Sequence, residues 1–290
     1  MIFTTLGTMG GPVANPQRSQ PAHLLHNNKQ AILIDAGDGT IAQLTKAGVS
    51  LQAIHTIILS HGHIDHTGGL FAVLGTRFQE PVASELTIYG PPGTQQMIDG
   101  IIAGLQPLIR TMPARVPTST PNALQCNVIE ITDGSLFTIG STRITAATNS
   151  HYSFKPGSKN AFLYQSLSYR FDMPDRSLVY TGDTGPSPNV ERLAHHADLL
   201  VSEVIDPQAG MDKARKSHRI PFYVKLILMN HLKKQHLTAE AVGSLAQCAN
   251  VKALVLIHNA LDTEDIAIAR RTIGLHYHGP ITFASDLESF

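Results

Sequence analysis

The chain is 290 residues long, and its 22 Lys and Arg balance its 22 Asp and Glu, so its formal net charge at neutral pH is zero. Hydrophobic residues make up 42% of it, which excludes a disordered chain and provides the core of one large domain or two modest ones. The balanced charge argues against nucleic acid as a partner, because nucleic-acid binders usually carry excess positive charge. No apolar run approaches the roughly 18–20 residues that cross a bilayer, so we expect no membrane partner.

Two further features concern the cellular location. The first seven residues, Met-Ile-Phe-Thr-Thr-Leu-Gly, lack the basic segment that begins a secretory signal. The two cysteines, Cys126 and Cys248, are too few for a disulfide framework, and we interpret both as small buried thiols in a reducing compartment. Together these features predict a cytoplasmic protein.

Short apolar runs alternate with stretches of helical spacing along the chain. The apolar runs predict strands over residues 31–35, 56–60, 86–89, 126–132, 142–147, 163–171, 177–181, 198–202, 252–257 and 280–284. The helical spacing predicts helices over residues 40–47, 67–76, 93–105, 187–195, 219–234, 238–249 and 263–273. This alternation is typical of a mixed α/β protein with two packed sheets and helices outside them. No charge run or low-complexity tract marks a linker, so we treat residues 1–290 as a single domain.

Two segments interrupt this alternation. Residues 106–125 contain four prolines and predict a long loop, which is either a functional lid or a simple surface excursion. Residues 205–235 are interpreted as a helical insertion whose helix, over 219–234, has a face too apolar to remain in water. Three interpretations of that face stay open: part of the core, a lid over the site, or a homodimer contact.

The chain contains 15 histidines, and three of them lie within residues 60–69, which read Ser-His-Gly-His-Ile-Asp-His-Thr-Gly-Gly. Side chains two residues apart in an extended chain point to the same side, so His61 and His63 are expected to bind one metal ion. Asp65 and His66 lie beyond the turn and can face a second ion. Imidazole and carboxylate ligands suit zinc and, less selectively, manganese or iron.

Three more ligand-type residues follow predicted strands directly: His151, Asp183 and His258. Taken singly, each has a structural interpretation, since Asp183 could cap the helix near residue 187 and His258 could close a strand. Taken together and in this order, they favour a binuclear metal site presented by strand ends.

The ordered pattern His-x-His-x-Asp-His, then His, Asp and His, resembles the metallo-β-lactamase-fold hydrolase superfamily over nearly the whole chain. The resemblance implies an αββα metallo-β-lactamase-type sandwich with a metal site along one edge of the two sheets. It also implies two divalent metal ions, zinc in the first instance, with manganese or iron as alternatives. The implied ligands of the first ion are His61, His63 and His151. The implied ligands of the second ion are Asp65, His66 and His258, with Asp183 bridging both ions.

Three short segments bring the sequence closer to the branch that contains ribonuclease Z, arylsulfatases and cyclic-nucleotide phosphodiesterases. They are Gly-Thr-Met-Gly-Gly-Pro at 7–12, Tyr-Thr-Gly-Asp-Thr at 180–184 and His-Leu-Thr-Ala-Glu at 236–240. The resemblance implies catalytic roles for Asp65 and for His236, the latter in proton transfer, although His236 could equally be a structural residue before a helix. Many true β-lactamases of this fold use a cysteine ligand where this chain has Asp183, which disfavours antibiotic hydrolysis.

Ribonuclease Z itself fits less well in our interpretation, because its members usually carry a long RNA-gripping arm where this chain has only 31 residues, between His151 and Asp183. With zero net charge as well, we expect a small anionic ester as substrate, either a phosphodiester or a sulfate ester, attacked by a metal-activated hydroxide. The alternatives are a lactone or ester hydrolase, and a di-iron or non-catalytic binding member of the fold. Glu203, at a strand end, could orient a ligand histidine or form a buried ion pair.

Overall fold

We describe the chain from a computed structural model, which covers residues 1–26, 30–79, 85–111, 126–152, 154–155, 157–209, 211 and 221–290. These residues form two compact units. The first unit consists of Met1–Thr8, Ala14–Ile131 and Ser285–Phe290, and the second of Met9–Val13 and Thr132–Ala284. Each unit contains one sheet. The division does not test the expectation of a single domain over residues 1–290, which stays a prediction.

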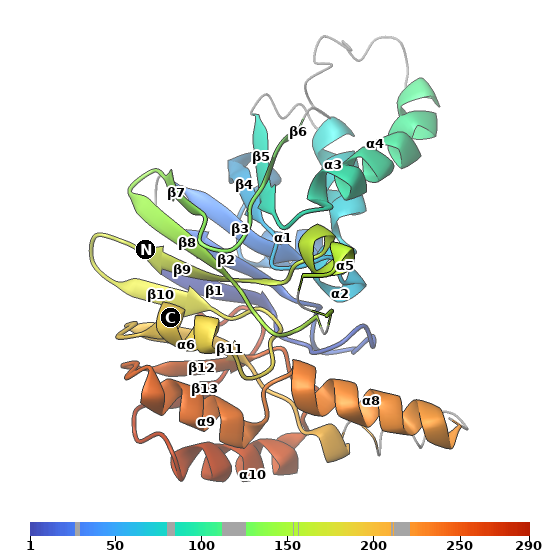
Figure 1. The fold of residues 1–290 in the computed structure, drawn as a ribbon. Coiled ribbons are helices and arrows are strands. Elements are labelled where there is room, and N and C mark those ends of the chain that lie inside the picture. The colour runs from blue at the N-terminus through green and yellow to red at the C-terminus, as the bar shows by residue number, and fades with distance from the viewer. Residues whose placement is uncertain are drawn as a thin grey trace. The chain divides into compact units, whose positions relative to one another are not determined.

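The first unit contains a six-stranded sheet in the order β1-β2-β3-β4-β5-β6, drawn from blue to green in Figure 1. Its strands are β1 (Ile2–Gly7), β2 (Ala22–His26), β3 (Ala31–Ala36), β4 (Ile54–Ile58), β5 (Leu86–Gly90) and β6 (Cys126–Glu130). The first three strands pair antiparallel, and β3 to β6 pair parallel. Parallel strands are usually buried on both faces, which explains the continuous apolar runs by which β3 and β4 were predicted. Neither β1 nor β2 was among the predicted strands.

Most helices of the first unit pack apolar side chains against this sheet. The helices of this unit are α1 (Thr40–Lys46), the one-turn η1 (Leu51–Ala53), α2 (Ile64–Thr67), α3 (Leu70–Gln79) and α4 (Thr94–Thr111). Leu44, Leu74 and Leu105 are buried in one apolar cluster with the strands. The predicted loop over 106–125 is wrong for residues 106–111, which continue α4 despite Pro107, because neighbouring apolar side chains pack against this cluster. Residues 112–125 lie outside the described residues.

The second unit contains a seven-stranded sheet in the order β13-β12-β11-β10-β9-β8-β7 (Figure 1). Its strands are β7 (Leu136–Ile139), β8 (Thr142–Thr148), β9 (Leu167–Asp172), β10 (Ser177–Tyr180), β11 (Leu199–Glu203), β12 (Leu254–Ile257) and β13 (Ile281–Phe283). Strands β7 to β10 pair antiparallel, and β10 to β13 pair parallel. The parallel strands β10, β11 and β12 therefore end at one edge of the sheet, and three of the candidate site residues lie at or just beyond these ends.

The helices of the second unit are α5 (Lys159–Leu163), α6 (Pro188–Ala194), α8 (Phe222–Gln235), α9 (Ala239–Cys248) and α10 (Thr263–Gly274). The Thr238 side chain caps α9 by accepting the N–H of Ala241, and Asp262 forms a capping box with Asp265 at the start of α10. Helices α6, α9 and α10 bury apolar residues in one cluster with the sheet. The predicted strand over 163–171 begins too early, because Leu163 is the last residue of α5.

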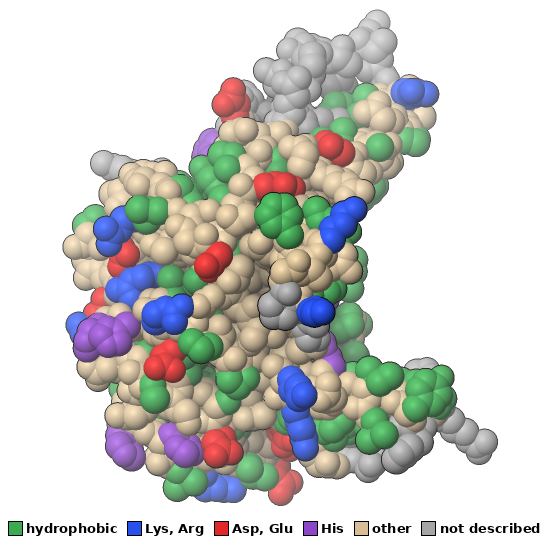
Figure 2. All heavy atoms as spheres, in the orientation of Figure 1, with side chains coloured by type: hydrophobic (Ala, Val, Ile, Leu, Met, Phe, Trp, Pro, Cys, Tyr) green, Lys and Arg blue, Asp and Glu red, His purple; other side chains and the backbone are tan. Residues whose placement is uncertain are grey.

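Helix α8 lies in the expected insertion over 205–235, of which residues 210 and 212–220 lie outside the described residues. None of its described side chains is buried, and Tyr223, Leu226 and Ile227 are 66%, 57% and 66% exposed. Figure 2 shows hydrophobic side chains gathered over this helix. The core interpretation is therefore wrong for these residues, whereas the lid and homodimer interpretations stay predictions. Neither α8 nor any other helix within the described residues is long and apolar enough to cross a membrane.

The two cysteines differ in their surroundings. Cys126 is partly buried at the start of β6, and burial raises the pKa of its thiol to about 11. Cys248, at the end of α9, is exposed, so the expectation that both thiols are buried is wrong for this one. The expected cytoplasmic location, which rested partly on these cysteines, stays a prediction.

Candidate functional site

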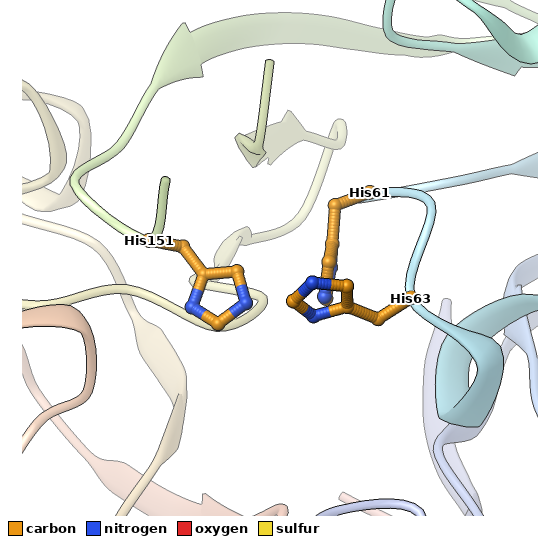
Figure 3. Close-up of side chains that lie close together, drawn as sticks. All are labelled: His61, His63 and His151. Atoms are coloured by element: carbon orange, nitrogen blue, oxygen red, sulfur yellow. The ribbon is translucent and has the colours of Figure 1, made fainter. Parts of the chain in front are cut away.

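In the first unit, the candidate site is the turn that follows β4. His61 and His63 leave this turn with their ring centroids 4.7 Å apart and their planes at 76° (Figure 3). Their ligand atoms lie within 4.8 Å of one another. His61 is fully buried and His63 is exposed. The pair can thus contact one ion, and that it does so stays a prediction. His151, drawn in the same figure, belongs to the second unit.

Asp65 and His66 lie on the short helix α2 and are both buried. The Nε2 atom of His66 is 3.7 Å from Oδ2 of Asp65, and the ring centroids of His66 and His61 are 4.2 Å apart. One imidazole and one carboxylate therefore face each other beside the first pair of histidines. This set of donors is one that divalent ions such as zinc accept.

Asp35, at the end of β3, holds this turn in place. Its Oδ1 accepts the N–H of Ser60 at 2.7 Å, and its Oδ2 accepts the Ser60 hydroxyl at 2.7 Å and the Nδ1–H of His66 at 2.8 Å. The hydroxyl of Ser60 in turn accepts the Nδ1–H of His61 at 3.0 Å. With both Nδ1 atoms protonated, both Nε2 atoms present lone pairs suited to a metal.

The sequence analysis did not assign Asp35 a role at the site. The sequence held one signal for such a role, an acidic residue at the end of an apolar strand. In the structure this strand, β3, lies next to β4 in the sheet. Its backbone has φ of +55°, in the left-handed region, where aspartate is several-fold enriched over most residues.

The role of Asp35 leads to a prediction about metal affinity. In Asp35→Asn, an NH2 group replaces one carboxylate oxygen. At least one of the groups that donate to Asp35, on Ser60 or His66, therefore loses its acceptor. We expect metal affinity to fall by roughly 10- to 100-fold, the usual effect of removing a partner that orients a metal ligand. Competition with a chromophoric chelator measures this change, with the exposed Asp38→Asn as matched control. Parent-like affinity in Asp35→Asn would contradict the assigned role.

In the second unit, three buried histidines lie around one buried carboxylate. Asp183, after β10, lies among His151 after β8, His258 after β12 and His236 at the end of α8. Its Oδ1 is 3.3 Å from His258 Nε2, whereas its Oδ2 is 3.9 Å from both His151 Nε2 and His236 Nδ1. Ligand atoms of His151, Asp183 and His236 all lie within 4.8 Å of one another. The two oxygens thus face different imidazoles.

Two of these histidines are held by acceptors at the ring nitrogen Nδ1. The Nδ1–H of His151 donates to the carbonyl of Gln235 at 3.0 Å, which leaves its Nε2 toward Asp183. The Nδ1–H of His236 donates to Oε2 of Glu203 at 2.7 Å. Glu203 is fully buried, and burial raises the pKa of its carboxyl, while the attraction of His236 opposes that shift. Glu203 therefore forms a buried pair with His236 and orients it, whereas the interpretation that Glu203 orients a metal ligand stays a prediction.

The glycine-rich segment near the start of the chain packs against His258. The N–H of Gly11 donates to His258 Nε2 at 3.4 Å, and a Cβ atom at Gly10 would lie 2.8 Å from the His258 carbonyl. Only glycine fits at position 10 without a shift of this backbone. His258 itself has φ of +43°, a left-handed conformation that costs roughly 1–3 kcal/mol and is typical of functional sites.

The structure also adds a histidine that the sequence analysis did not consider. His231, on α8, has its ring centroid 6.0 Å from that of His151 and 5.2 Å from that of His236. Burial and the neighbouring His236 lower its pKa. Its Nδ1 contacts Oε1 of Gln235. The only signal in the sequence was its position five residues before His236.

Comparisons with known proteins identify the family. Residues 30–259 match the model of the family described as "Beta-lactamase superfamily domain". Ribonuclease Z of Mycobacterium avium (strain 104) is 29% identical over 264 residues, which are 89% of this chain and 86% of that protein. Ribonuclease Z of Mycobacterium bovis (strain BCG / Pasteur 1173P2) is 30% identical over 70% of each chain.

Solved structures give the same fold at lower identity. The metallo-beta-lactamase fold protein YhfI from Bacillus subtilis matches with a TM-score of 0.71 and 18% identity, over 100% of this chain and 98% of that one. The short form of human tRNase Z matches with a TM-score of 0.67 and 23% identity, over 100% and 98% of the two chains. With the two mixed sheets and their helices, these matches confirm the expected α/β fold of metallo-β-lactamase type.

The same relatives overturn one expectation. Nucleic acid was not expected as a partner, yet these relatives carry the names ribonuclease Z and tRNase Z. The inference from net charge failed because zero is a sum over all 290 residues. A nucleic-acid site needs positive charge only where the phosphate backbone of the nucleic acid binds. The preference for a small anionic ester over RNA relied on the same sum and on the short stretch between His151 and Asp183, and the relatives named ribonuclease Z overturn it as well.

Proposed function

Because the chain belongs to the beta-lactamase superfamily and is a metal-dependent hydrolase, we propose that it hydrolyses phosphodiester bonds of RNA at a binuclear zinc centre. The observation that carries the proposal is the carboxylate of Asp183, whose two oxygens face different buried imidazoles. Such a carboxylate can contact two ions at once. The relatives named ribonuclease Z support RNA as the substrate class.

We assign the metal ligands from their order in the sequence and from the arrangement within each unit. The first unit supplies His61, His63, Asp65 and His66. The second unit supplies His151, Asp183 and His258. Following the family resemblance, we assign the first ion to His61, His63 and His151. The second ion is assigned to Asp65, His66 and His258, with Asp183 contacting both ions. Two bound divalent ions would polarise the phosphate and lower the pKa of a water molecule.

The remaining residues are assigned to support this reaction. Glu203 positions His236 through the 2.7 Å hydrogen bond at Nδ1, so that His236 can deliver a proton from its other nitrogen to the leaving oxygen. Asp65, buried beside His66, orients the attacking group as well as binding metal. These two are the catalytic residues of the proposal.

The function is tested with a panel of substrates on the metal-loaded protein. We expect cleavage of an RNA that contains a single-stranded segment, and no comparable turnover of an aryl sulfate, a lactone or a β-lactam. Metal analysis should give two zinc ions per chain, and a chelator should stop cleavage. Turnover of the sulfate or the lactone without cleavage of any phosphodiester would contradict the proposal, as would iron with visible absorption.

The proton-transfer role predicts how His236→Ala behaves. The variant should keep its metal and lose up to roughly 100- to 10,000-fold in kcat on RNA, the usual contribution of general acid catalysis. The loss should be small on bis(4-nitrophenyl) phosphate, because nitrophenolate leaves without a proton whereas a ribose alkoxide does not. His195→Ala, which removes an exposed histidine of the same unit, serves as control and should behave as the parent. Equal losses on both substrates, or a loss of metal, would return His236 to a structural role.

A further inference from the structure

A row of aromatic rings starts at the candidate ligand His151. The ring centroids of His151 and Tyr152 are 5.3 Å apart, those of Tyr152 and Phe154 are 5.8 Å apart, and those of Phe154 and Tyr164 are 6.2 Å apart. Tyr152 and Phe154 follow β8, whereas Tyr164 is the residue directly after α5. The row therefore joins two segments of the second unit and begins directly at the proposed centre.

The outer part of this row is exposed to solvent. Phe154 is 37% exposed and Tyr164 is 48% exposed, and Phe162 on α5 is 73% exposed. Helix α5 has no buried residue at all. Single exposed apolar residues are common on proteins, but Phe154 and Tyr164 are both exposed and adjacent to each other, and contiguous exposed apolar groups usually mark a binding surface.

The charge around the rings indicates what binds there. Residues 150–166 contain two lysines and no aspartate or glutamate. Lys155 and Lys159 are both exposed, next to the aromatic row in the sequence. Aromatic rings interleaved with positive charges are the combination by which proteins hold single-stranded nucleic acid, with bases on the rings and phosphates beside the cations.

We propose that Tyr152, Phe154 and Tyr164 form a stacking platform for unpaired bases of an RNA substrate, and that Lys155 and Lys159 contact its phosphates. This inference rests on the proposed function and adds to it the side chains that would hold unpaired bases of the substrate. Bases in a duplex hide their faces from side chains, whereas unpaired bases present them. Because every base has such a face, the platform tolerates different sequences.

The test removes a ring from the protein and a base from the RNA. Phe154→Ala and Tyr164→Ala should each lower kcat/KM for an RNA with an intact single-stranded segment by roughly 5- to 150-fold, the range that stacking of one base accounts for. Phe154→Tyr and Tyr164→Phe should restore most of it. Abasic nucleotides in that segment should cost the parent protein a similar factor and cost the alanine variants little more. Tyr223→Ala, which removes an exposed ring on α8, is the control and should behave as the parent.

A binding measurement separates this inference from the proposed function. The parent should quench the fluorescence of 2-aminopurine placed in a single-stranded oligonucleotide, and the alanine variants should not. If the parent cleaves no phosphodiester, the proposed function fails, and the quenching still decides whether the platform exists. The platform is overturned if the alanine variants quench like the parent, or if they lose activity equally on intact and abasic RNA. It is also overturned if Tyr164→Ala converts a dimer to a monomer, since the rings would then contact a second copy.

Discussion

Replacing Asp183 by Ala is expected to release both metal ions and to lower kcat/KM for RNA by at least about 1,000-fold. The carboxylate lies 3.3 Å from His258 Nε2 and 3.9 Å from His151 Nε2, so its loss affects the proposed ligands of both ions. Bound ions contribute several kcal/mol to charge stabilisation in the transition state, and each 1.36 kcal/mol corresponds to about tenfold in rate.

Metal content per chain and kinetics on RNA measure this effect together. Asp172→Asn is the matched control, because Asp172 is a partly exposed carboxylate of the same unit that pairs with Arg143 and Arg170. Glu203→Ala should reduce metal content less than Asp183→Ala, since Glu203 reaches the site through His236 and His258. Two tightly bound ions in Asp183→Ala would refute the bridging role.

The spacing within 60–69 was sufficient to predict which candidate ligands of the first unit lie side by side. His61 lies beside His63, and Asp65 beside His66, because these pairs are local and depend only on the alternation of an extended chain and on one helical turn. Asp35 could not be found in this way. It reaches Ser60 across 25 residues through the parallel pairing of β3 with β4, and a single sequence carries no signal for that pairing.

Local sequence patterns likewise predicted part of the fold. Buried parallel strands such as β4 and β12 were predicted from their unbroken apolar runs. Strand β1 was missed because two threonines interrupt its apolar run. Thr5 is buried all the same, since its hydroxyl donates to the carbonyl of Ser285 at 2.7 Å. The start of the strand predicted over 163–171 was wrong because Ser158 caps a short helix by accepting the N–H of Ala161, which overrides the apolar pattern there.

The second large effect is expected at His63, whose exposure makes the experiment clean. His61 is fully buried, so His61→Ala would disturb packing as well as metal binding, whereas removal of an exposed side chain usually changes stability by less than about 0.5 kcal/mol. In His63→Ala we therefore expect an unchanged thermal midpoint of the metal-free protein. Metal affinity should fall by more than the roughly 10- to 100-fold that loss of an orienting residue costs, because a direct ligand is removed.

The matched control is His55→Ala, which removes an exposed histidine from β4 in the same unit. It should keep both ions and the full rate, whereas His63→Ala should resemble the chelator-treated parent and recover in part when zinc is added in excess. Metal analysis measures the metal content, calorimetry of the metal-free proteins measures the thermal midpoint, and kinetics on RNA measure the rate. Full metal content and full rate in His63→Ala would show that the exposed ring beside His61 is no ligand, and the assignment of the first ion would then be wrong.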